Sequence, residues 1–495
     1  MSAVRPNRLI FAGAAAATLI VALFLTAVDG GQDKIRYQQH LEQPSEAALG
    51  PRPETEGLIT HLPILSMDTG GTDIPALDHN GQLIDPVTAQ RSIPPAGMMP
   101  EVAVSVAVRD AENAWHTEQD APSAVVQGQI RIRGNSSRNF DKKSYLLRLD
   151  EKSGLLGMPA AGEWVLNGPF LDRTLVRNYL CYTTAGQIMA YAPNCRFCEV
   201  TLNGEYRGVY LLIEAIAREE GRLPLTKPEQ GRDLTSWLVR WDRTGKGDTP
   251  LDNFAYYTLR GGVSGLDLRY PGKSQITEGR RTFAETEISA IEHQLYAAQT
   301  AHGDNHVFDA VDVTAFAQYF VINEFFRNVD AGRFSTFFYK DIRGKVTPCV
   351  WDFNNACDNY IDYVYGDSGF SMQNAPWFDA LLRNERFVDE VIYQYRTLRA
   401  GPLSDETLRG LIDGTVDYLG SAIDRNYAVF GYVFTPTQAD GMRYLTPLAR
   451  NDLTYEEAVE RLETWLADRG AWLDKHIDSL RQYCQPSRNA GSALY

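Results

Sequence analysis

Alternating apolar and polar positions predict strands in the first half of the chain. Every second residue from Val102 to Val108 is valine, and Gln129–Arg133 and Tyr145–Leu149 show similar alternation. The clearest local pattern is FCEVTLNGEYRGVYLLIE, residues 197–214. Its two β-rich runs flank Asn203-Gly204, the dipeptide favoured in type I′ hairpin turns.

Apolar residues at three- and four-residue spacing predict helices, most of them in the second half. The predicted helices are Asp172–Ala190, Phe283–Ala298, Val313–Phe326, Ser404–Tyr427 and Tyr455–Leu480. Gly221–Gly265 is predicted to consist of loops with short elements. The fold class is therefore α+β, a sheet-rich part followed by a mostly helical part. This order of parts is that of a two-lobed, atypical protein-kinase-like fold, at the level of analogy alone.

The N-terminus carries an apolar run from Leu9 to Val28, preceded by Arg5 and Arg8. About 20 apolar residues are enough to span a bilayer, and the arginines favour an uncleaved anchor with its start in the cytoplasm. Leu25-Thr26-Ala27 is a poor signal-peptidase site, although secretion after cleavage stays the alternative. The bulk of the chain is expected to be extracytoplasmic.

The same patterns divide the chain into five parts. We expect an anchor or signal sequence at 1–28, a Gly-, Pro-, Gln- and Asp-rich linker at 29–95, and a sheet-rich N-lobe at 96–217. A mainly helical C-lobe at 218–485 and a tail at 486–495 follow.

Charge and cysteine content restrict the function. The chain of 495 residues has 48 basic and 63 acidic side chains, a net charge of −15, which argues against nucleic acid as a partner. A nucleotide ligand stays compatible with this net charge, because a local pocket can be positive on an acidic protein.

Among six cysteines, Cys195 and Cys198 form a single C-x-x-C. Burial or disulfide bonding is expected for the cysteines, rather than redox chemistry or zinc binding.

The segment RIRGNSSRNFDKKSYLLRL, residues 131–149, offers a first chemical site. Residues 134–137 follow a strand and can present backbone N–H groups and hydroxyls to phosphate. Lys142 and Lys143 come next, and strand alternation favours Lys143 as the phosphate lysine. An ordinary polar hairpin is the alternative, and the spacing is not that of a Walker A loop.

Two carboxylates in the second half form the other candidates. Asp330 lies where a helical pattern breaks, so it can either cap a turn or hold a hydroxyl nucleophile at a cleft. Asp352 follows a short apolar strand and precedes Asn354, Asn355, Asp358 and Asn359. Such oxygen-rich residues suit a hard cation such as Mg²⁺, with a polar loop of Asx turns as the alternative.

Several separated motifs together resemble the CotH family of spore-coat-type atypical protein kinases. They are RGNSS…KKSYLLRL, LLGMPAAGEWVLNGPFLDRTLVRNYL, LNGEYRGVYLLIE, NVDAGRFSTFFYKD, VWDFN and ERLETWLADRGAWLDKHIDSL, and they span about Val102 to Leu480. The resemblance implies transfer of the γ-phosphoryl group of ATP, with Mg²⁺ or Mn²⁺, to Ser or Thr of a surface or coat protein.

The resemblance also implies roles for single residues. Asp330 would be the catalytic-loop carboxylate, and Asp352 with Asn354 would hold the metal. The phosphate side would be lined by Arg133, Asn135, Ser136, Lys142 and Lys143. The segment that begins at Glu214 would meet adenine where the two lobes join.

The chain departs from the family pattern at two places. Many members have W-D-F-D-x-x-x-G-N, whereas this chain has Asn354, which adds no charge, with Asp358 as a further candidate ligand. The predicted helix Asp172–Ala190 has no glutamate to pair with a lysine, which leaves Asp172, Glu163 or Glu199 for that role. A non-catalytic surface or assembly protein on the same scaffold is therefore the main alternative, and a cation-dependent hydrolase a weaker one.

Overall fold

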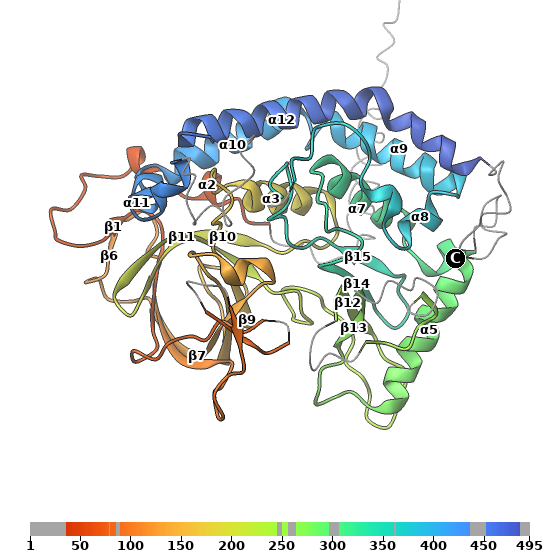
Figure 1. The fold of residues 1–495 in the computed structure, drawn as a ribbon, viewed down its shortest axis with the longest axis horizontal. Coiled ribbons are helices and arrows are strands. Elements are labelled where there is room, and N and C mark those ends of the chain that lie inside the picture. The colour runs from red at the N-terminus through yellow and green to blue at the C-terminus, as the bar shows by residue number, and fades with distance from the viewer. Residues whose placement is uncertain are drawn as a thin grey trace, which may run out of the picture. The chain divides into compact units, whose positions relative to one another are not determined.

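The computed structural model describes residues 36–485, except 79, 86–89, 245–249, 256–263, 297–305, 361–362 and 436–451. It is a mixed α+β structure, with a sheet-rich N-terminal region and a helical C-terminal region (Figure 1). The predicted fold class is confirmed at this level. The predicted membrane segment Leu9–Val28 lies outside the described residues, and none of the described helices is long and apolar enough to cross a bilayer.

A closed barrel of seven strands dominates the N-terminal region, in the order β10-β11-β9-β8-β7-β5-β2. The strands are β2 (Ile64–Asp68), β5 (Val102–Arg109), β7 (Ala124–Arg133), β8 (Ser144–Ser153), β9 (Ala161–Asn167), β10 (Cys195–Leu202) and β11 (Glu205–Glu214). Parallel pairing of β10 with β2 closes a barrel whose other neighbours are antiparallel.

Alternation along the barrel strands separates a packed interior from an outer face. Ile130 and Ile132 of β7 point into a cluster of buried apolar side chains that fills the barrel. Arg131 and Arg133 lie at the positions between them, on the outer face. Cross-strand pairs continue that outer row from Arg131 through Leu146 and Val165 to Ile213. Leu146, Val165 and Ile213 of this outer row are themselves buried in the main hydrophobic core, so the barrel is packed on this face as well as inside.

The hairpin of β10 and β11 forms as the sequence predicts. Leu202 pairs with Glu205, and both Asn203 (φ 52°) and Gly204 (φ 78°) adopt the left-handed conformation of a type I′ turn. The Asn203 side-chain oxygen accepts a hydrogen bond from the backbone N–H of Thr69 at 2.9 Å, which ties the turn to the end of β2.

A second sheet, in the order β13-β12-β14-β15, stands among the helices of the C-terminal region. Its strands are β12 (Trp237–Arg243), β13 (Ser264–Tyr270), β14 (Thr336–Lys340) and β15 (Thr347–Cys349). Two short pairs complete the strands, β1 (Ile59–Thr60) with β6 (His116–Thr117) and β3 (Leu83–Ile84) with β4 (Arg91–Ser92).

The α-helices are α2 (Gln39–Glu42), α3 (Arg177–Ile188), α5 (Glu278–Tyr296), α6 (Val307–Ala310), α7 (Val313–Phe325), α8 (Phe378–Leu381), α9 (Glu385–Arg399), α10 (Asp405–Leu419), α11 (Ser421–Phe430) and α12 (Tyr455–His476). The 3₁₀ helices are η1 (Glu46–Ala48), η2 (Ser136–Asn139), η4 (Met372–Asn374), η5 (Gly431–Phe434) and η8 (Ile477–Cys484). Side chains of Ser404 and Thr454 cap α10 and α12 as N-cap acceptors.

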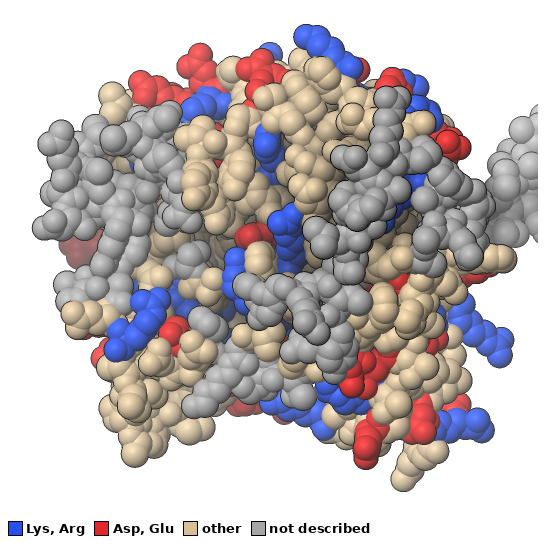
Figure 2. Space-filling view, turned by 45° about the vertical axis from the view of Figure 1, so that its right-hand side comes forward, with Lys and Arg blue, Asp and Glu red and all other residues tan. Residues whose placement is uncertain are grey.

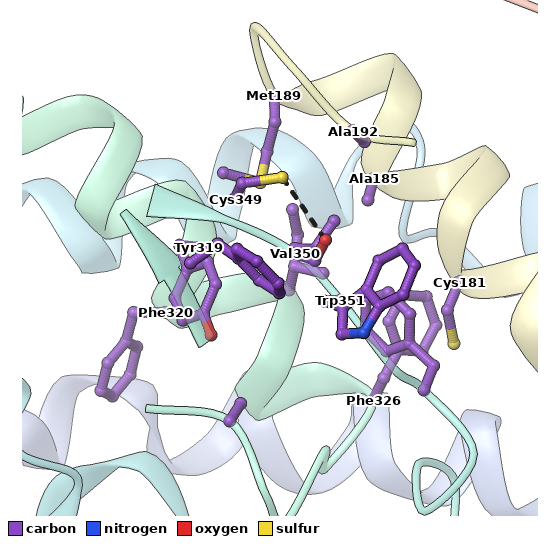
Figure 3. Packing of buried hydrophobic residues seen from close by; sticks show 14 of the residues in the cluster. Cys181, Ala185, Met189, Ala192, Tyr319, Phe320, Phe326, Cys349, Val350 and Trp351 are labelled. Atoms are coloured by element: carbon purple, nitrogen blue, oxygen red, sulfur yellow. Dashed lines mark hydrogen bonds between the residues drawn. The ribbon is translucent and has the colours of Figure 1, made fainter. Parts of the chain in front are cut away.

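The core that carries the second sheet also connects α3 to α7. Figure 3 shows Cys349 and Val350, at the end of β15, between Met189 and Ala185 on one side and Tyr319 of α7 on the other. Trp351 is 8% exposed and follows directly. A buried strand thus delivers the next residue, Asp352, to the edge of this core.

The region 221–265, predicted as loops with short elements, contains the short strand β12, whose Trp237–Val239 run is buried on both faces and so does not alternate. Two sequence predictions about elements need correction. The predicted linker contains β2, whose five residues are too few for sustained alternation but pair with β5 and β10. The predicted helix Ser404–Tyr427 is divided at Gly420 (φ 47°, ψ −131°) into α10 and α11.

All six cysteines lie in the described part of the chain, and all six are buried and outside any disulfide. The expected burial is confirmed, and the structure contains none of the disulfides that the sequence left open.

A buried ion pair joins α11 to the barrel. Arg425 donates hydrogen bonds to both carboxylate oxygens of Glu199, at 2.9 and 2.8 Å, and a third to Thr60 Oγ1 at 2.9 Å. The Glu199 side chain is fully buried, and Arg425 is the cation paired with it.

We predict that Arg425→Met lowers the free energy of unfolding by about 3–5 kcal/mol, because it leaves a buried carboxylate without its cation. Urea denaturation measures the change. Arg409→Met is the matched control: its side chain is 61% exposed and 4.0 Å from Glu463, so we expect a change within about 0.5 kcal/mol. Equal losses of unfolding free energy in the two variants would contradict the importance of the Arg425–Glu199 ion pair.

Candidate active site

Asp330 lies on the turn that follows α7. Its backbone oxygen accepts hydrogen bonds from the N–H groups of Arg333 and Phe334, which close the turn. One side-chain oxygen accepts a 2.7 Å hydrogen bond from Asn355 Nδ2, and the other lies 3.8 Å from Arg243 Nη2. Burial, reinforced by the nearby charge of Asp352, raises the pKa of Asp330 above its ordinary value. A carboxylate with a raised pKa is better suited to accept a proton.

Asp352 follows β15 in a left-handed conformation, with φ 57°. This is uncommon for a residue with a side chain, and two hydrogen bonds hold it there. The backbone N–H of Asp352 donates to Tyr182 Oη of α3 at 2.9 Å, and its backbone oxygen accepts from Asn328 Nδ2 at 3.3 Å. Because Asn328 lies two residues before Asp330, this contact joins the turns that carry the two candidate carboxylates.

Asn354 is bound by two other asparagines. Its side-chain oxygen accepts hydrogen bonds from Asn178 Nδ2 of α3 at 2.8 Å and from Asn167 Nδ2 of β9 at 3.1 Å. Its Nδ2 donates to Asp352 Oδ1 at 2.5 Å. A carboxylate only accepts, so this network fixes the amide with its nitrogen toward Asp352.

The oxygen of Asn354 was expected to be a metal ligand. In the structure it faces Asn167 and Asn178, and turning the amide over would exchange two hydrogen bonds for donor–donor contacts. The geometry therefore gives Asn354 the role of positioning Asp352. Asp358 lies apart from this network: its Oδ1 accepts from the backbone N–H of Tyr365, and its Oδ2 is 4.0 Å from Arg461.

Arg133, at the end of β7, reaches the same region from the barrel. Its guanidinium carbon is 5.4 Å from the centre of the Trp351 ring, so the cation stacks beside the residue that precedes Asp352. The next residue, Gly134, has φ 105°, and the loop then enters η2 with Asn135 exposed. Ser136 is the first residue of η2. The predicted phosphate-side loop thus begins beside Asp352.

The two candidate lysines have different environments, and neither belongs to β8, which starts at Ser144. Lys142 is fully buried: Nζ donates to Asn426 Oδ1 of α11 at 2.6 Å and lies 5.1 and 5.2 Å from the ring centres of Tyr210 and Phe430. Lys143 is half-buried and donates to the backbone oxygen of Arg138 in the loop at 3.0 Å. Only Lys143 is placed beside the phosphate-side loop with part of its surface exposed.

The acidic residues considered as partners for a lysine are paired with arginines instead. Asp172 accepts from Arg177 at 2.6 Å, Glu163 from Arg148 at 3.1 Å, and Glu199 from Arg425. From α3, Asn178 reaches the Asp352 loop alongside Tyr182, and its side-chain oxygen accepts from the backbone N–H of Phe353 at 3.2 Å.

Glu214 ends β11, where the chain leaves the barrel. It is fully buried, and its Oε2 accepts from the backbone N–H of Asn194 at 2.9 Å. Its Oε1 has no hydrogen-bond partner among the described residues. A ligand at this junction would therefore meet the main chain after Glu214 rather than an exposed carboxylate.

Four residues at the site were missed by the sequence analysis: Asn167, Asn178, Tyr182 and Arg243. Each comes from an element distant in sequence from both carboxylates, and only the fold brings them together. The one available signal for these residues was Asn178, because an asparagine on a largely buried helix is unusual. Figure 2 shows acidic and basic side chains interspersed on one face of the molecule.

The site has the composition of one that binds magnesium together with a phosphate-bearing ligand. The described residues contain no group of three or more His, Cys, Asp or Glu side chains arranged to hold a metal. Mg²⁺ commonly takes one or two carboxylates, with water and ligand phosphates as its other ligands. Asp352, with Arg133 and the 134–137 loop nearby, fits that requirement.

Comparison with known proteins places the chain in a family. The chain belongs to the CotH kinase protein family, whose sequence profile matches residues 130–473. It is similar to the inner spore coat protein H of Bacillus subtilis (strain 168), with 33% identity over 87 residues. That alignment covers 18% of this chain and 23% of the relative.

Lys142 should make the stability of the fold depend on pH. Burial lowers its pKa from 10.5 to about 7 in the folded state. Between these values the unfolded chain binds more protons, so stability should rise with pH, by up to about 1.4 kcal/mol per pH unit. We predict that Lys142→Met removes this slope, measured by urea denaturation at several pH values from 7 to 9. Lys152→Met replaces an exposed side chain and should leave the pH dependence of the unfolding free energy unchanged. A Lys142→Met variant with the same pH dependence as the wild type would contradict the prediction.

Replacing Asn354 by Asp should make the site depend on a divalent cation. Two carboxylates would then face each other, and we expect Asn354→Asp to lower the unfolding free energy by about 1–3 kcal/mol in chelator. Millimolar Mg²⁺ or Mn²⁺ should raise the melting temperature of this variant more than that of the wild type. Asn374→Asp adds the same charge at an exposed position and is the control. An identical metal response in all three proteins would refute the prediction.

Proposed function

We propose that this chain is an ATP-dependent protein kinase that phosphorylates Ser or Thr of a protein substrate. The family membership supports the reaction class. The observation that carries the proposal is the pairing of Asp330 and Asp352 on adjacent turns, joined by the hydrogen bond from Asn328 to the backbone of Asp352. We further propose that the barrel region and the helical region act as the N- and C-lobes of an atypical kinase, with the site where they meet.

Each residue has a distinct task in this proposal. The hydroxyl oxygen of the substrate forms a bond to the γ-phosphorus while the bond to the β,γ-bridging oxygen breaks, and ADP leaves with that electron pair. Asp330 orients the hydroxyl and accepts its proton, for which its raised pKa suits it. Asp352 holds Mg²⁺ or Mn²⁺, which when bound neutralises phosphate charge.

The remaining polar groups position these two carboxylates and the nucleotide. Asn354 donates a hydrogen bond to Asp352 and is itself held by Asn178, while Asn355 donates to Asp330. Arg133, Lys143 and the loop with Asn135 and Ser136 take the phosphate side. The main chain after Glu214 faces adenine. Catalysis then comes from positioning and fixed charges.

We also propose that an N-terminal helix anchors the protein in a membrane, with the kinase region outside the cytoplasm and a coat or surface protein as its substrate. The apolar run Leu9–Val28 supports the anchor, and the name of the Bacillus relative supports a coat setting. Sequencing the N-terminus of the mature protein tests the anchor, and a start near Val28 would replace it by secretion.

A non-catalytic surface protein is the second candidate function. One observation favours it: Asn354 is neutral, and its oxygen is already bound by Asn167 and Asn178. In that case the amide network would serve only to hold the loop.

We predict that Asp330→Asn lowers the rate of phosphoryl transfer by about 10²–10⁴-fold, because the hydroxyl loses its proton acceptor. Asp352→Asn should instead abolish metal-dependent nucleotide binding. The assay uses full-length protein in detergent with labelled ATP, Mg²⁺ or Mn²⁺, and either the protein itself or a Ser-rich protein as acceptor.

Asp424→Asn, at an exposed position on α11, is the matched control and should retain full activity. Wild-type protein that neither binds nucleotide nor transfers phosphate would disprove the kinase and leave the non-catalytic function.

A further inference from the structure

Two arginines flank the candidate carboxylates in a similar way. Arg133 lies over the Trp351 ring beside Asp352, and Arg243 lies over the Phe334 ring beside Asp330. The Arg243 guanidinium carbon is 3.7 Å from the ring centre, which is a close stack. Arg133 belongs to the phosphate side of the proposed site, but Arg243 has no role in the reaction so far.

Arg243 is held at a fixed place by the second sheet. It ends β12, the strand paired on one side with β13 and on the other with β14. Phe334 belongs to the turn closed by hydrogen bonds to the Asp330 backbone oxygen. The strand that carries Arg243 and the turn that carries both Asp330 and Phe334 thus fix the guanidinium against the candidate catalytic carboxylate.

Among the residues that the structure describes, the guanidinium of Arg243 makes one carboxylate contact. This is the 3.8 Å approach to Asp330, which is too long for a hydrogen bond. Within the described residues its guanidinium donates no hydrogen bond, and its side chain is 35% exposed. A guanidinium that is stacked, partly exposed and without acceptors is suited to bind an oxyanion with two parallel N–H donors.

The position of Arg243 indicates which oxyanion it would bind. Asp330 is the group proposed to hold the attacking hydroxyl, so the phosphoryl group under attack must come close to it. Asp242 and Asp352 add negative charge around Asp330. A polyphosphate brought into this region needs a cation on the acceptor side, and buried Lys142 cannot supply it. Arg243 is the cation placed there.

We propose that Arg243 binds oxygens of the γ-phosphoryl group and stabilises it during transfer to the hydroxyl held by Asp330. The inference rests on the proposed kinase function and adds a residue to its site. In the absence of nucleotide, the negatively charged group beside Arg243 is the Asp330 carboxylate, 3.8 Å away.

The test compares nucleotides with and without a γ-phosphoryl group, in full-length protein with Mg²⁺. Affinities for the β,γ-imido analogue of ATP and for ADP are measured by calorimetry. Arg243→Gln should weaken binding of the analogue by roughly ten-fold or more and leave ADP within about two-fold, because only the analogue has the group that Arg243 contacts. Arg243→Lys keeps the charge without the planar fork, so its affinity for the analogue should lie between those of the wild type and Arg243→Gln.

Arg240→Gln is the matched control, since Arg240 lies on the same strand but pairs with Asp242 and Asp267. It should change neither affinity. An unchanged ratio of the two affinities in Arg243→Gln, with wild type binding both nucleotides, would overturn the role of Arg243 and leave the kinase proposal standing. If Arg243→Gln does not fold, the same comparison in Arg243→Lys decides. Wild type that binds neither nucleotide would overturn the kinase proposal itself.

Discussion

The left-handed backbone of Asp352 is the constraint on which the candidate site depends. A non-glycine residue with φ near 57° costs of order 1 kcal/mol or more, and the structure offsets this with hydrogen bonds to both sides of the residue. Tyr182 accepts its N–H, and Asn328 donates to its carbonyl. Through these contacts α3 and the turn after α7 are fixed to one residue. The loop continues with two more left-handed residues, Cys357 and Asp358, so its course is set locally as well.

The carboxylates of the site are held by hydrogen bonds rather than by close ion pairs. Some buried carboxylates elsewhere have close arginines: Glu199 has Arg425, and Glu324 has Arg469 at 2.6 Å. Asp330 and Asp352 receive their hydrogen bonds from asparagine amides, as buried Glu292 does from Asn253. Amides hold a carboxylate in place without cancelling its charge. Under the proposed function these two carboxylates would face the divalent cation, and the stacked arginines Arg133 and Arg243 lie at the margins of the site.

The sequence revealed the elements whose patterns are local. The Asn203-Gly204 hairpin, the valine-alternating strand β5 and helix α7 follow from turn chemistry and periodicity. Closure of the barrel could not be predicted from such patterns, because β2 is short and pairs with strands far along the chain. At the site, the Asp330 and Asp352 candidates came from their positions after a helix and a strand. Their partners did not, because Asn167, Asn178 and Arg243 become neighbours only through packing between elements.

Asn354 is the residue at which structure changes the interpretation most. From sequence it reads as a weakened metal ligand, a loss relative to the family pattern. In the structure its amide supplies what an aspartate there cannot, a donor to Asp352 together with an acceptor for Asn167 and Asn178. An aspartate in its place would put two carboxylates in contact and require a cation between them. This chain can thus assemble its loop before any metal binds, and a metal would meet a preformed carboxylate. A preformed loop lowers the entropy cost of ordering the site when a metal binds, while the neutral Asn354 side chain lowers the electrostatic attraction for that metal. In the proposed kinase, metal affinity would therefore be set by a balance of two opposed terms rather than by loss of a ligand alone.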